Sequence, residues 1–482
     1  MPSRWAIWSA IGAGTFLNVL DNSMMNVSLP TVTREFASDV GTIQWVVTGY
    51  MLVISSLLLT GGRLADVYGR KRLYLAGLAI FTLASAIAGF SVSPTMLIAC
   101  RIAQGVGSAL VQGVGTAIVV SAFPSSERGR ALGLNATVVA LGGITGPILG
   151  GIVADTLGWR WIFWLRIPIA ILCVAATARL VPNDTPTGPR RRFDVAGAVL
   201  IFIALATLLL ALSQGRFLGW GSAVVIGLFA TSAATWFAFV RVELRVPEPM
   251  LPLDVFKNRA FAGASAASFL SFCATSSSFF LMPFYLIDGL GFPASQAGFL
   301  MVPGAIFMSI AAPLSGTLSD RYGSRVLSPI GLLMIVAAFL SLSRLTADMS
   351  ALDVVWRSAL LGLGMGTFMS PNNNTLIGSV PRERVGLAAG TMASVRNLGN
   401  VVGVAIAGTI LINRQEIYLP DLLAAGVGQA AAHARSLVGG IDDAYLIAGV
   451  LAFLALIVTS LRGASEPDRP VASHAEATST SG

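Results

Sequence analysis

An aspartate stands within the first apolar stretch of the chain, in the segment LDNSMMNVSLP at residues 20–30. A charge at the centre of a membrane helix costs roughly 3 kcal/mol or more, so Asp21 requires a partner or a purpose. On a helix, Asn18, Asp21, Met25 and Ser28 would share one face, because they lie three or four residues apart. Such a polar face must line a cavity or contact another helix, and an acid placed there can bind and release a proton.

A second polar stripe occurs at helical spacing in the apolar stretch 95–121, and it consists of Arg101, Gln104, Ser108 and Gln112. Asp21 and Arg101 are both predicted to lie in the outer half of the membrane, so the two side chains can approach each other. Two interpretations follow. Asp21 and Arg101 form a functional pair whose carboxylate takes up and releases a proton, or they form a static buried ion pair.

Helices that cross a membrane must position these side chains. The chain has 482 residues, of which 55% are hydrophobic and 11% are charged, whereas soluble domains carry about 25% charged residues. Apolar runs of about 20 residues, the length that spans a bilayer, occur fourteen times. They lie at 6–30, 44–62, 73–91, 95–121, 131–154, 159–180, 194–213, 221–240, 260–287, 295–317, 326–345, 352–374, 386–412 and 444–461. We therefore predict an all-α polytopic membrane protein with fourteen transmembrane helices.

Lysine and arginine are distributed unevenly between the two sides of the predicted membrane. If the N-terminus is cytoplasmic, most of them fall on the inner side, including RKR at 70–72 and RRR at 190–192. Because cytoplasmic loops are enriched in these residues, we place both termini in the cytoplasm, in a multi-pass protein of a bacterial cytoplasmic membrane. The polar tail 463–482 is predicted to be disordered. The long outer stretch 413–443 is predicted to form a helix that lies on the membrane surface.

The composition argues against several classes of function. The net charge is +8, but no soluble domain gathers the basic residues, so we expect no nucleic acid partner. Both histidines lie outside the apolar stretches, so we expect no metal or haem site. The spans contain no catalytic set of histidine, cysteine or paired carboxylates, so we do not expect an enzyme. The expected partners are protons, a small-molecule substrate and the lipid bilayer, with no cofactor beyond the proton gradient. The protein is expected to be a monomer.

The sequence repeats itself after about 255 residues. GRLADVYGRKRL at 62–73 aligns with GTLSDRYGSRVL at 316–327, and PSSERGRALG at 124–133 aligns with PRERVGLAAG at 381–390. A repeat of this length contains six predicted helices and indicates two halves of the same orientation. The apolar stretches 194–213 and 221–240 have no counterpart. The predicted units are an N-terminal six-helix bundle at 1–185, an inserted helix pair at 186–255, a C-terminal six-helix bundle at 256–462 and the tail.

The repeated loop combines glycine, aspartate and basic residues in register, which indicates a mechanical part rather than a topology signal alone. GGRLADVYGRKR resembles the loop signature G-x-L-x-D-R-x-G-R-[KR] of the major facilitator superfamily, with Val67 in place of an arginine. The resemblance implies a cytoplasmic latch that holds the two halves together when the transporter faces outward. The predicted latch residues are Gly62, Asp66, Gly69, Arg70, Lys71, Asp320 and Arg321.

The fifth apolar stretch carries a run of glycines and a proline. Gly142, Gly146 and Gly150 recur every four residues and leave a smooth face for close helix contact, while Pro147 removes a backbone hydrogen bond. Helix packing alone could explain this pattern, but the run also matches the antiporter motif G-x8-G-x3-G-P-x2-G-G of the same superfamily. That motif implies an exporter, and it comprises Gly133, Gly142, Gly146, Pro147, Gly150 and Gly151.

Two further segments resemble the fourteen-helix drug:proton antiporters of this superfamily. LDNSMMNVSLP is similar to their span-one motif L-D-x-T-[IV]-V-N-V-A-L-P, from which Met24 and Met25 depart, and RIAQGVG is similar to their span-four arginine motif. The resemblance implies the major facilitator fold and a proton-coupled antiporter that exports small lipophilic or cationic compounds by alternating access, as in multidrug efflux and antibiotic resistance. It also implies that Asp21 and Arg101 couple this export to protons, which is the role that we predict for them. The alternative is a dedicated exporter of one endogenous metabolite, siderophore or lipid.

The substrate cavity is predicted to be lined by Asn18, Met25, Gln104, Gln112 and Arg166. Arg166 stands inside the segment WRWIFWLRIP, and an arginine within a span is a candidate for a functional role. The sequence leaves open whether this side chain faces the substrate or extends to the membrane surface.

Overall fold

The computed structural model describes residues 3–183, 194–246, 253–380 and 385–461, and the regular elements in these ranges are helices. Those of the N-terminal half are α1 (Arg4–Glu35), the one-turn α2 (Val40–Ile43), α3 (Trp45–Tyr68), α4 (Arg70–Ala88), α5 (Pro94–Ala122), α6 (Ser125–Thr156) and α7 (Trp161–Leu180). The inserted pair is α8 (Val195–Leu218) and α9 (Ala223–Glu243). The C-terminal half consists of α10 (Arg259–Phe284), α11 (Ala294–Tyr322), α12 (Ser324–Leu342), α13 (Ala351–Gly378), α14 (Val385–Ala424) and α15 (Gln429–Leu461). A 3-10 turn at Leu253–Lys257 precedes α10, and a π-helical turn at Tyr285–Gly289 follows it.

The prediction of fourteen long helices is confirmed. Within the described residues, 12 helical segments are long and apolar enough to cross a membrane. The two long helices outside this set are α1 and α13, whose polar side chains lower their hydropathy. In α1 these include Asn18 and Asp21, and in α13 they include Arg357 and Asn372. The most polar spans are therefore α1, the first helix of the N-terminal half, and α13, the fourth helix of the C-terminal half.

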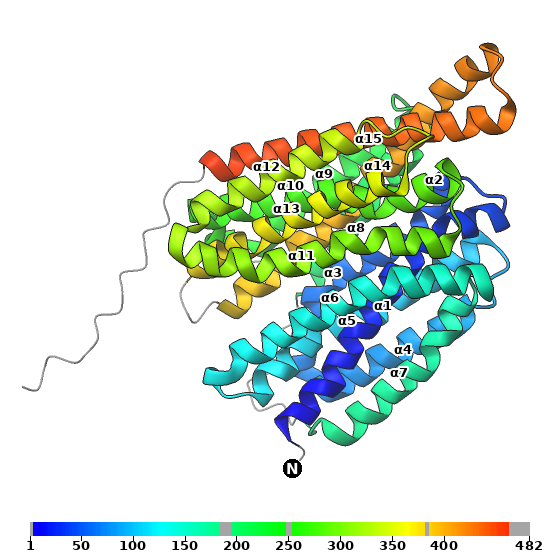
Figure 1. Ribbon diagram of the computed structural model, residues 1–482. Coiled ribbons are helices and arrows are strands. Elements are labelled where there is room, and N and C mark those ends of the chain that lie inside the picture. Colours follow the sequence, from blue (N-terminus) through cyan, green and yellow to red (C-terminus); the bar gives the residue numbers. More distant parts are fainter. Residues whose placement is uncertain (1–2, 184–193, 247–252, 381–384, 462–482) are drawn as a thin grey trace, which may run out of the picture.

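The two halves repeat one packing scheme. In the N-terminal half α1 packs on α6 and α5 packs on both α3 and α4, whereas in the C-terminal half α10 packs on α14 and α13 packs on both α11 and α12. Figure 1 shows the halves side by side, with the N-terminal half (blue to cyan) below the C-terminal half (green to red). Gly69 and Gly323, which align in the repeated loop, both turn the chain between two helices with a φ of 94° and 82° respectively. A left-handed φ is accessible to glycine without strain, so the repeat preserves this residue type at both turns.

The inserted helices form a hairpin beside the seam between the halves. Ser232 of α9 donates a hydrogen bond to the Ala204 carbonyl of α8, at 2.8 Å. Thr409 of α14 donates another to the Leu212 carbonyl of α8, at 3.1 Å. Because α8 also packs on α3, the hairpin contacts one helix of each half. The tail 463–482 lies outside the described residues.

The expectation of a surface-lying helix at 413–443 is wrong. Helix α14 continues to Ala424 and α15 starts at Gln429, so the segment is the extension of two long helices. Figure 1 shows this hairpin (orange) projecting from one end of the C-terminal half. Polar contacts hold its two helices together, because Asp443 pairs with Arg414 at 3.0 Å and accepts a hydrogen bond from the Tyr418 hydroxyl at 2.7 Å. The charge distribution predicts this end of the molecule to be outside, and we call it the outer end.

Candidate functional site

Asp21 lies in the interior of the N-terminal half between two arginines. Its Oδ2 is 2.7 Å from Nη1 of Arg101 on α5, and its Oδ1 contacts Nη1 of Arg166 on α7. All three side chains are buried, with 0 or 1% of their surface exposed. Three helices of one bundle thus bring one carboxylate and two guanidinium groups together, and we call these three residues the Asp21 cluster.

The arginines of the Asp21 cluster are held by further polar and aromatic contacts. Arg101 donates to the Val46 carbonyl of α3 at 3.1 Å and to Oε1 of Gln104 at 2.8 Å, and its guanidinium lies 4.0 Å above the ring of Tyr50. Gln104 in turn donates to Ser85 Oγ of α4 at 2.6 Å. Five helices of the N-terminal half therefore fix the orientation of the cluster.

Arg166 has a smaller set of contacts. Its Nε donates to the Ile162 carbonyl one turn earlier in α7, at 2.7 Å, and its guanidinium lies 4.9 Å from the centre of the Phe163 ring. The side chain therefore points into the bundle, rather than extending to the membrane surface. Sequence reasoning did not pair it with Asp21, although both lie in spans and Asp21 is the available acid nearby. The imbalance of two arginines against one acid in these spans was the signal that could have indicated the pair.

The residues predicted to line a substrate cavity are distributed differently in the structure. Asn18, Met25, Gln104 and Arg166 are buried among the helices of this conformation, and Gln112 is half-buried. Asn18 donates a hydrogen bond to the Gly14 carbonyl of its own helix at 3.0 Å. The cavity roles of these five residues remain a prediction.

The glycine motif of α6 packs the helix against two neighbours. Gly142, Gly146 and Gly150 face α1, and a Cβ added to Gly150 would lie 2.7 Å from Met24 Cα. Gly151 instead faces the first residues of α11 in the other half, where an added Cβ would lie 2.9 Å from Ser295 Cα. Pro147 also borders α11, because its carbonyl lies against Gly298. The motif therefore permits close approach both within one half and between the halves.

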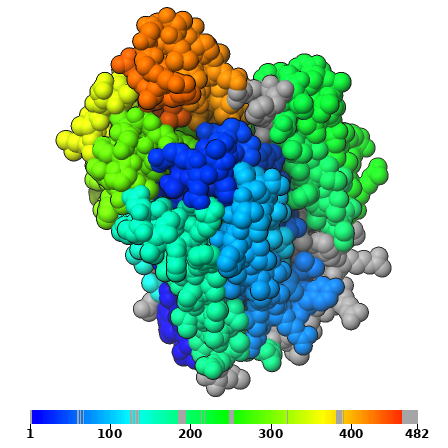
Figure 2. Space-filling view, turned by 90° about the vertical axis from the view of Figure 1, so that its right-hand side faces the viewer, coloured from blue at the N-terminus to red at the C-terminus, as the bar shows by residue number. Residues whose placement is uncertain are grey.

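Contacts at the outer end join the two halves. Asp155 at the end of α6 accepts hydrogen bonds from the backbone N–H groups of Ala294 and Ser295, which begin α11. Arg34 of α1 forms an ion pair with Asp288 at 3.4 Å. Figure 2 shows this outer face, where a dark blue segment of the N-terminal half lies against green and orange segments of the C-terminal half. The conformation is therefore closed at the outer end.

Comparison with known proteins identifies the family of this chain. The family model of the Major Facilitator Superfamily matches residues 11–404. The chain belongs to this superfamily. The riboflavin transporter RibZ of Clostridioides difficile (strain 630) is 30% identical over 459 residues, which cover 95% of this chain and 97% of RibZ.

A second relative and a solved structure extend the comparison. The multidrug resistance protein Stp of Mycobacterium tuberculosis (strain CDC 1551 / Oshkosh) is 35% identical over 403 residues, which cover 83% of this chain and 75% of Stp. Among solved structures, a bacterial homologue of the human lysosomal transporter Spinster, in an inward-facing and unoccupied conformation, has a TM-score of 0.68. The alignment covers 96% of this chain and 99% of the homologue, at 17% sequence identity. The two proteins therefore share a fold.

The predicted cytoplasmic latch of the transporter is described only in part. Lys71 donates a hydrogen bond to the Ala178 carbonyl at 2.7 Å, which ties α4 to the end of α7 within one half. Arg321 is exposed and lies 5.5 Å from the ring of Tyr322. Arg70 follows the turn at Gly69 as the first residue of α4. The side chains of Asp66 and Asp320, and the surroundings of Gly62 and of the motif residue Gly133, lie outside the described part of the structure. The latch remains a prediction.

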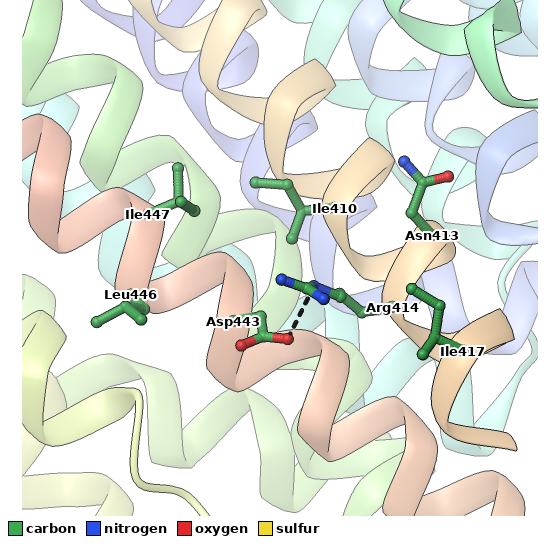
Figure 3. A pocket seen from close by; sticks show the side chains of 7 residues that line it. All are labelled: Ile410, Asn413, Arg414, Ile417, Asp443, Leu446 and Ile447. Atoms are coloured by element: carbon green, nitrogen blue, oxygen red, sulfur yellow. Dashed lines mark ion pairs between the residues drawn. The ribbon is translucent and has the colours of Figure 1, made fainter. Parts of the chain in front are cut away.

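A pocket of about 370 Å³ lies elsewhere, between α14 and α15 near the outer end (Figure 3). It is lined by Ile410, Asn413, Arg414, Ile417, Asp443, Leu446 and Ile447. Figure 3 shows the ion pair of Arg414 and Asp443 bridging the two helices. All lining residues come from α14 and α15 of the C-terminal half. The described residues contain no cluster of three or more side chains suited to hold a metal ion.

Proposed function

We propose that this transporter exports small lipophilic compounds in exchange for protons across a bacterial cytoplasmic membrane, as a monomer with both termini in the cytoplasm. The observation that carries the proposal is the position of Asp21, a carboxylate buried within a membrane bundle between two guanidinium groups. Ionisable groups at such depth are costly to bury, and in membrane proteins they mark ion pathways and proton relays. Proton transfer therefore accounts for the Asp21 cluster better than packing alone.

The ionised form of Asp21 suits the outer-closed conformation. Arg101 and Arg166 both contact the carboxylate, so its protonation here would leave two buried guanidinium groups without a counter-charge. We infer that the proton has already left Asp21 when the outer end is closed. Opening of the outer end would admit water and a new proton from outside. This cycle moves protons inward and can drive substrate outward as one half rocks against the other.

The glycine motif supports the movement that this cycle requires. Gly151 and Pro147 allow α6 to lie directly on α11 at the outer end, so the two helices can form a tight seal without interlocking side chains. A seal made by backbone contact and a few polar groups can separate and re-form. The inserted hairpin touches α3 and α14 at the other side of the seam, where it would accompany the movement.

The relatives support a small organic substrate. Stp is named a multidrug resistance protein and RibZ a riboflavin transporter. A broad substrate range agrees with the first name. The second candidate function is a dedicated exporter of one compound. It is supported by the similarity to RibZ, because the alignment covers 97% of that protein and its name gives a single substrate.

Proton movement in proteoliposomes tests the proposal. With a pH-sensitive dye inside the vesicles, a gradient of an exported compound should drive protons in the opposite direction. Several unrelated lipophilic compounds should each do so for a multidrug antiporter, whereas riboflavin alone would favour the dedicated exporter. Compounds that cross with no accompanying proton movement would contradict proton coupling. Asp421→Asn is the matched control, because this acid is exposed near the end of α14, outside both the Asp21 cluster and the contacts between the halves, and should leave proton movement unchanged.

A further inference from the structure

The spans contain four arginines, and three of them contact an acid. Arg101 and Arg166 pair with Asp21, and Arg357 pairs with Asp353 at 3.2 Å. The fourth is Arg396 on α14. It makes no ion pair or hydrogen bond with any side chain in the described part of the chain.

Arg396 is turned toward α10 by its position in α14. Met392, one turn before it, packs against a buried apolar cluster that includes Phe261 and Ala264 of α10. Gly399, almost one turn after it, also faces α10, because an added Cβ would lie 2.9 Å from Phe272 Cβ. Residues spaced by three or four share a helix face, so the Arg396 side chain leaves α14 on the side of α10. It is half-buried, which means that part of its surface remains accessible at this depth.

Helix α10, toward which Arg396 is turned, offers polar groups but no negative charge. Helix α10 has no aspartate or glutamate, and it carries the buried serines Ser265 and Ser268 between the levels of Ala264 and Phe272. Asn372 of α13 donates a hydrogen bond to Ser268 Oγ at 2.7 Å, so the three helices meet around neutral donors and acceptors. Asn400 follows Arg396 by one turn and is half-buried as well. Hydroxyl and amide groups beside a guanidinium make a setting in which a carboxylate can be bound.

The charges of both halves favour the same kind of ligand. In the N-terminal half the Asp21 cluster has two cations and one anion, and in the C-terminal half Arg396 adds a cation. Charges in a membrane interior are poorly screened, so this excess attracts an anion and repels a lipophilic cation. A guanidinium also binds a carboxylate through two parallel N–H groups, which a neutral compound cannot match.

We propose that Arg396 binds the acidic group of the substrate, and that the transporter prefers amphipathic organic anions with a carboxylate over lipophilic cations. This inference rests on the proposed export of small lipophilic compounds and narrows their class. It also adds a driving force. Exchange of an inward proton for an outward anion moves two charges in the direction favoured by an inside-negative membrane potential, whereas exchange for a cation moves none.

Protection of a cysteine beside Arg396 tests this assignment without a pH gradient. The variant carries Asn400→Cys, with the native Cys100, Cys173 and Cys273 replaced by alanine. A neutral thiol reagent labels the new cysteine in the presence of three matched compounds: naphthalene-2-carboxylate, naphthalene-2-carboxamide and 2-naphthylmethylammonium. The carboxylate should protect at about tenfold lower concentration than the ammonium compound. Arg396→Gln should remove this difference, Arg396→Lys should keep most of it, and Arg357→Gln should leave it unchanged.

Three results would overturn the proposal. They are a cysteine that no reagent reaches, equal or stronger protection by the ammonium compound in the parent, and an unchanged preference in Arg396→Gln. Labelling is measured without proton movement, so these results are separate from a failure of proton coupling. A transporter that shows the carboxylate preference but moves no protons would retain the Arg396 assignment and lose the antiport mechanism.

Discussion

The carboxylate of Asp155 lies 2.7 Å from the backbone nitrogen of Ser295, so a side chain of one half caps the first turn of a helix in the other. The second oxygen accepts from the Ala294 N–H at 3.1 Å. The first N–H groups of a helix have no partner within it, and an acid at this end also interacts favourably with the helix dipole. The cap can form only when α6 and α11 meet at the outer end, so it stabilises the closed conformation specifically.

Loss of this cap should open the outer end more often. Asp155→Ala should destabilise the closed conformation by about 1 kcal/mol, the usual contribution of a helix cap, and so raise the open population about fivefold. The measurement is the labelling rate, from outside, of a cysteine at Ala297, which is buried in α11 near the seam. Asp39→Ala is the control, since Asp39 caps α2 within its own half. Equal labelling in parent and Asp155→Ala would show that the cap does not hold the halves closed.

Substitutions at two glycines of α6 can distinguish the loss of a contact between the halves from the general effect of a larger side chain in this helix. A Cβ at Gly151 would meet the backbone of α11, whereas one at Gly143 would have nothing within 4 Å. Gly151→Leu should leave the protein inserted but prevent outer closure, because overpacking at such a contact costs about 1–3 kcal/mol. Gly143→Leu should retain export near the parent rate. Normal export by well-expressed Gly151→Leu would contradict the role of this contact.

The contacts of the Asp21 cluster predict how variants at Asp21 and Arg166 rank in stability. Asp21→Asn leaves two buried guanidinium groups without a counter-charge, and breaking a buried pair in this way costs about 3–5 kcal/mol. Arg166→Gln leaves the neutral pair of Asp21 and Arg101, so it should lower the melting temperature in detergent less. The double variant Asp21→Asn/Arg166→Gln should regain part of the stability that Asp21→Asn loses. If the effects of the two substitutions simply add, Arg166 does not interact with Asp21 in solution.

The sequence was sufficient to predict the fourteen helices and the approach of Asp21 to Arg101. Both inferences use length, hydropathy and depth, which apolar runs and charged loops define well. Polar side chains within a membrane need polar partners, so two polar stripes at the same depth on neighbouring helices are expected to contact each other. The left-handed turns at Gly69 and Gly323 likewise follow from the repeat, because both positions hold glycine in aligned loops.

Other features depend on which face of a helix a residue occupies, and the sequence of a uniformly apolar helix does not indicate this face. Arg166 stands in a segment that is hydrophobic on all sides, so its depth was clear but the face that it occupies was not. Asp155 reaches a helix that begins 139 residues later, a contact that no local pattern indicates. The end of α14 was placed too early because its outer extension is polar, and its pairing with α15 could be seen only in three dimensions.

The most direct test of the central claim is export by Asp21→Asn under an imposed pH gradient. Asparagine keeps the hydrogen-bonding shape of a protonated acid but cannot release a proton. In proteoliposomes, Asp21→Asn should lose uphill export of a compound that the parent pumps, but it should still bind that compound in a fluorescence titration. The control Asp421→Asn, at an exposed acid of α14, should both export and bind the compound. Uphill export by Asp21→Asn at the parent rate would contradict the claim that Asp21 carries the proton.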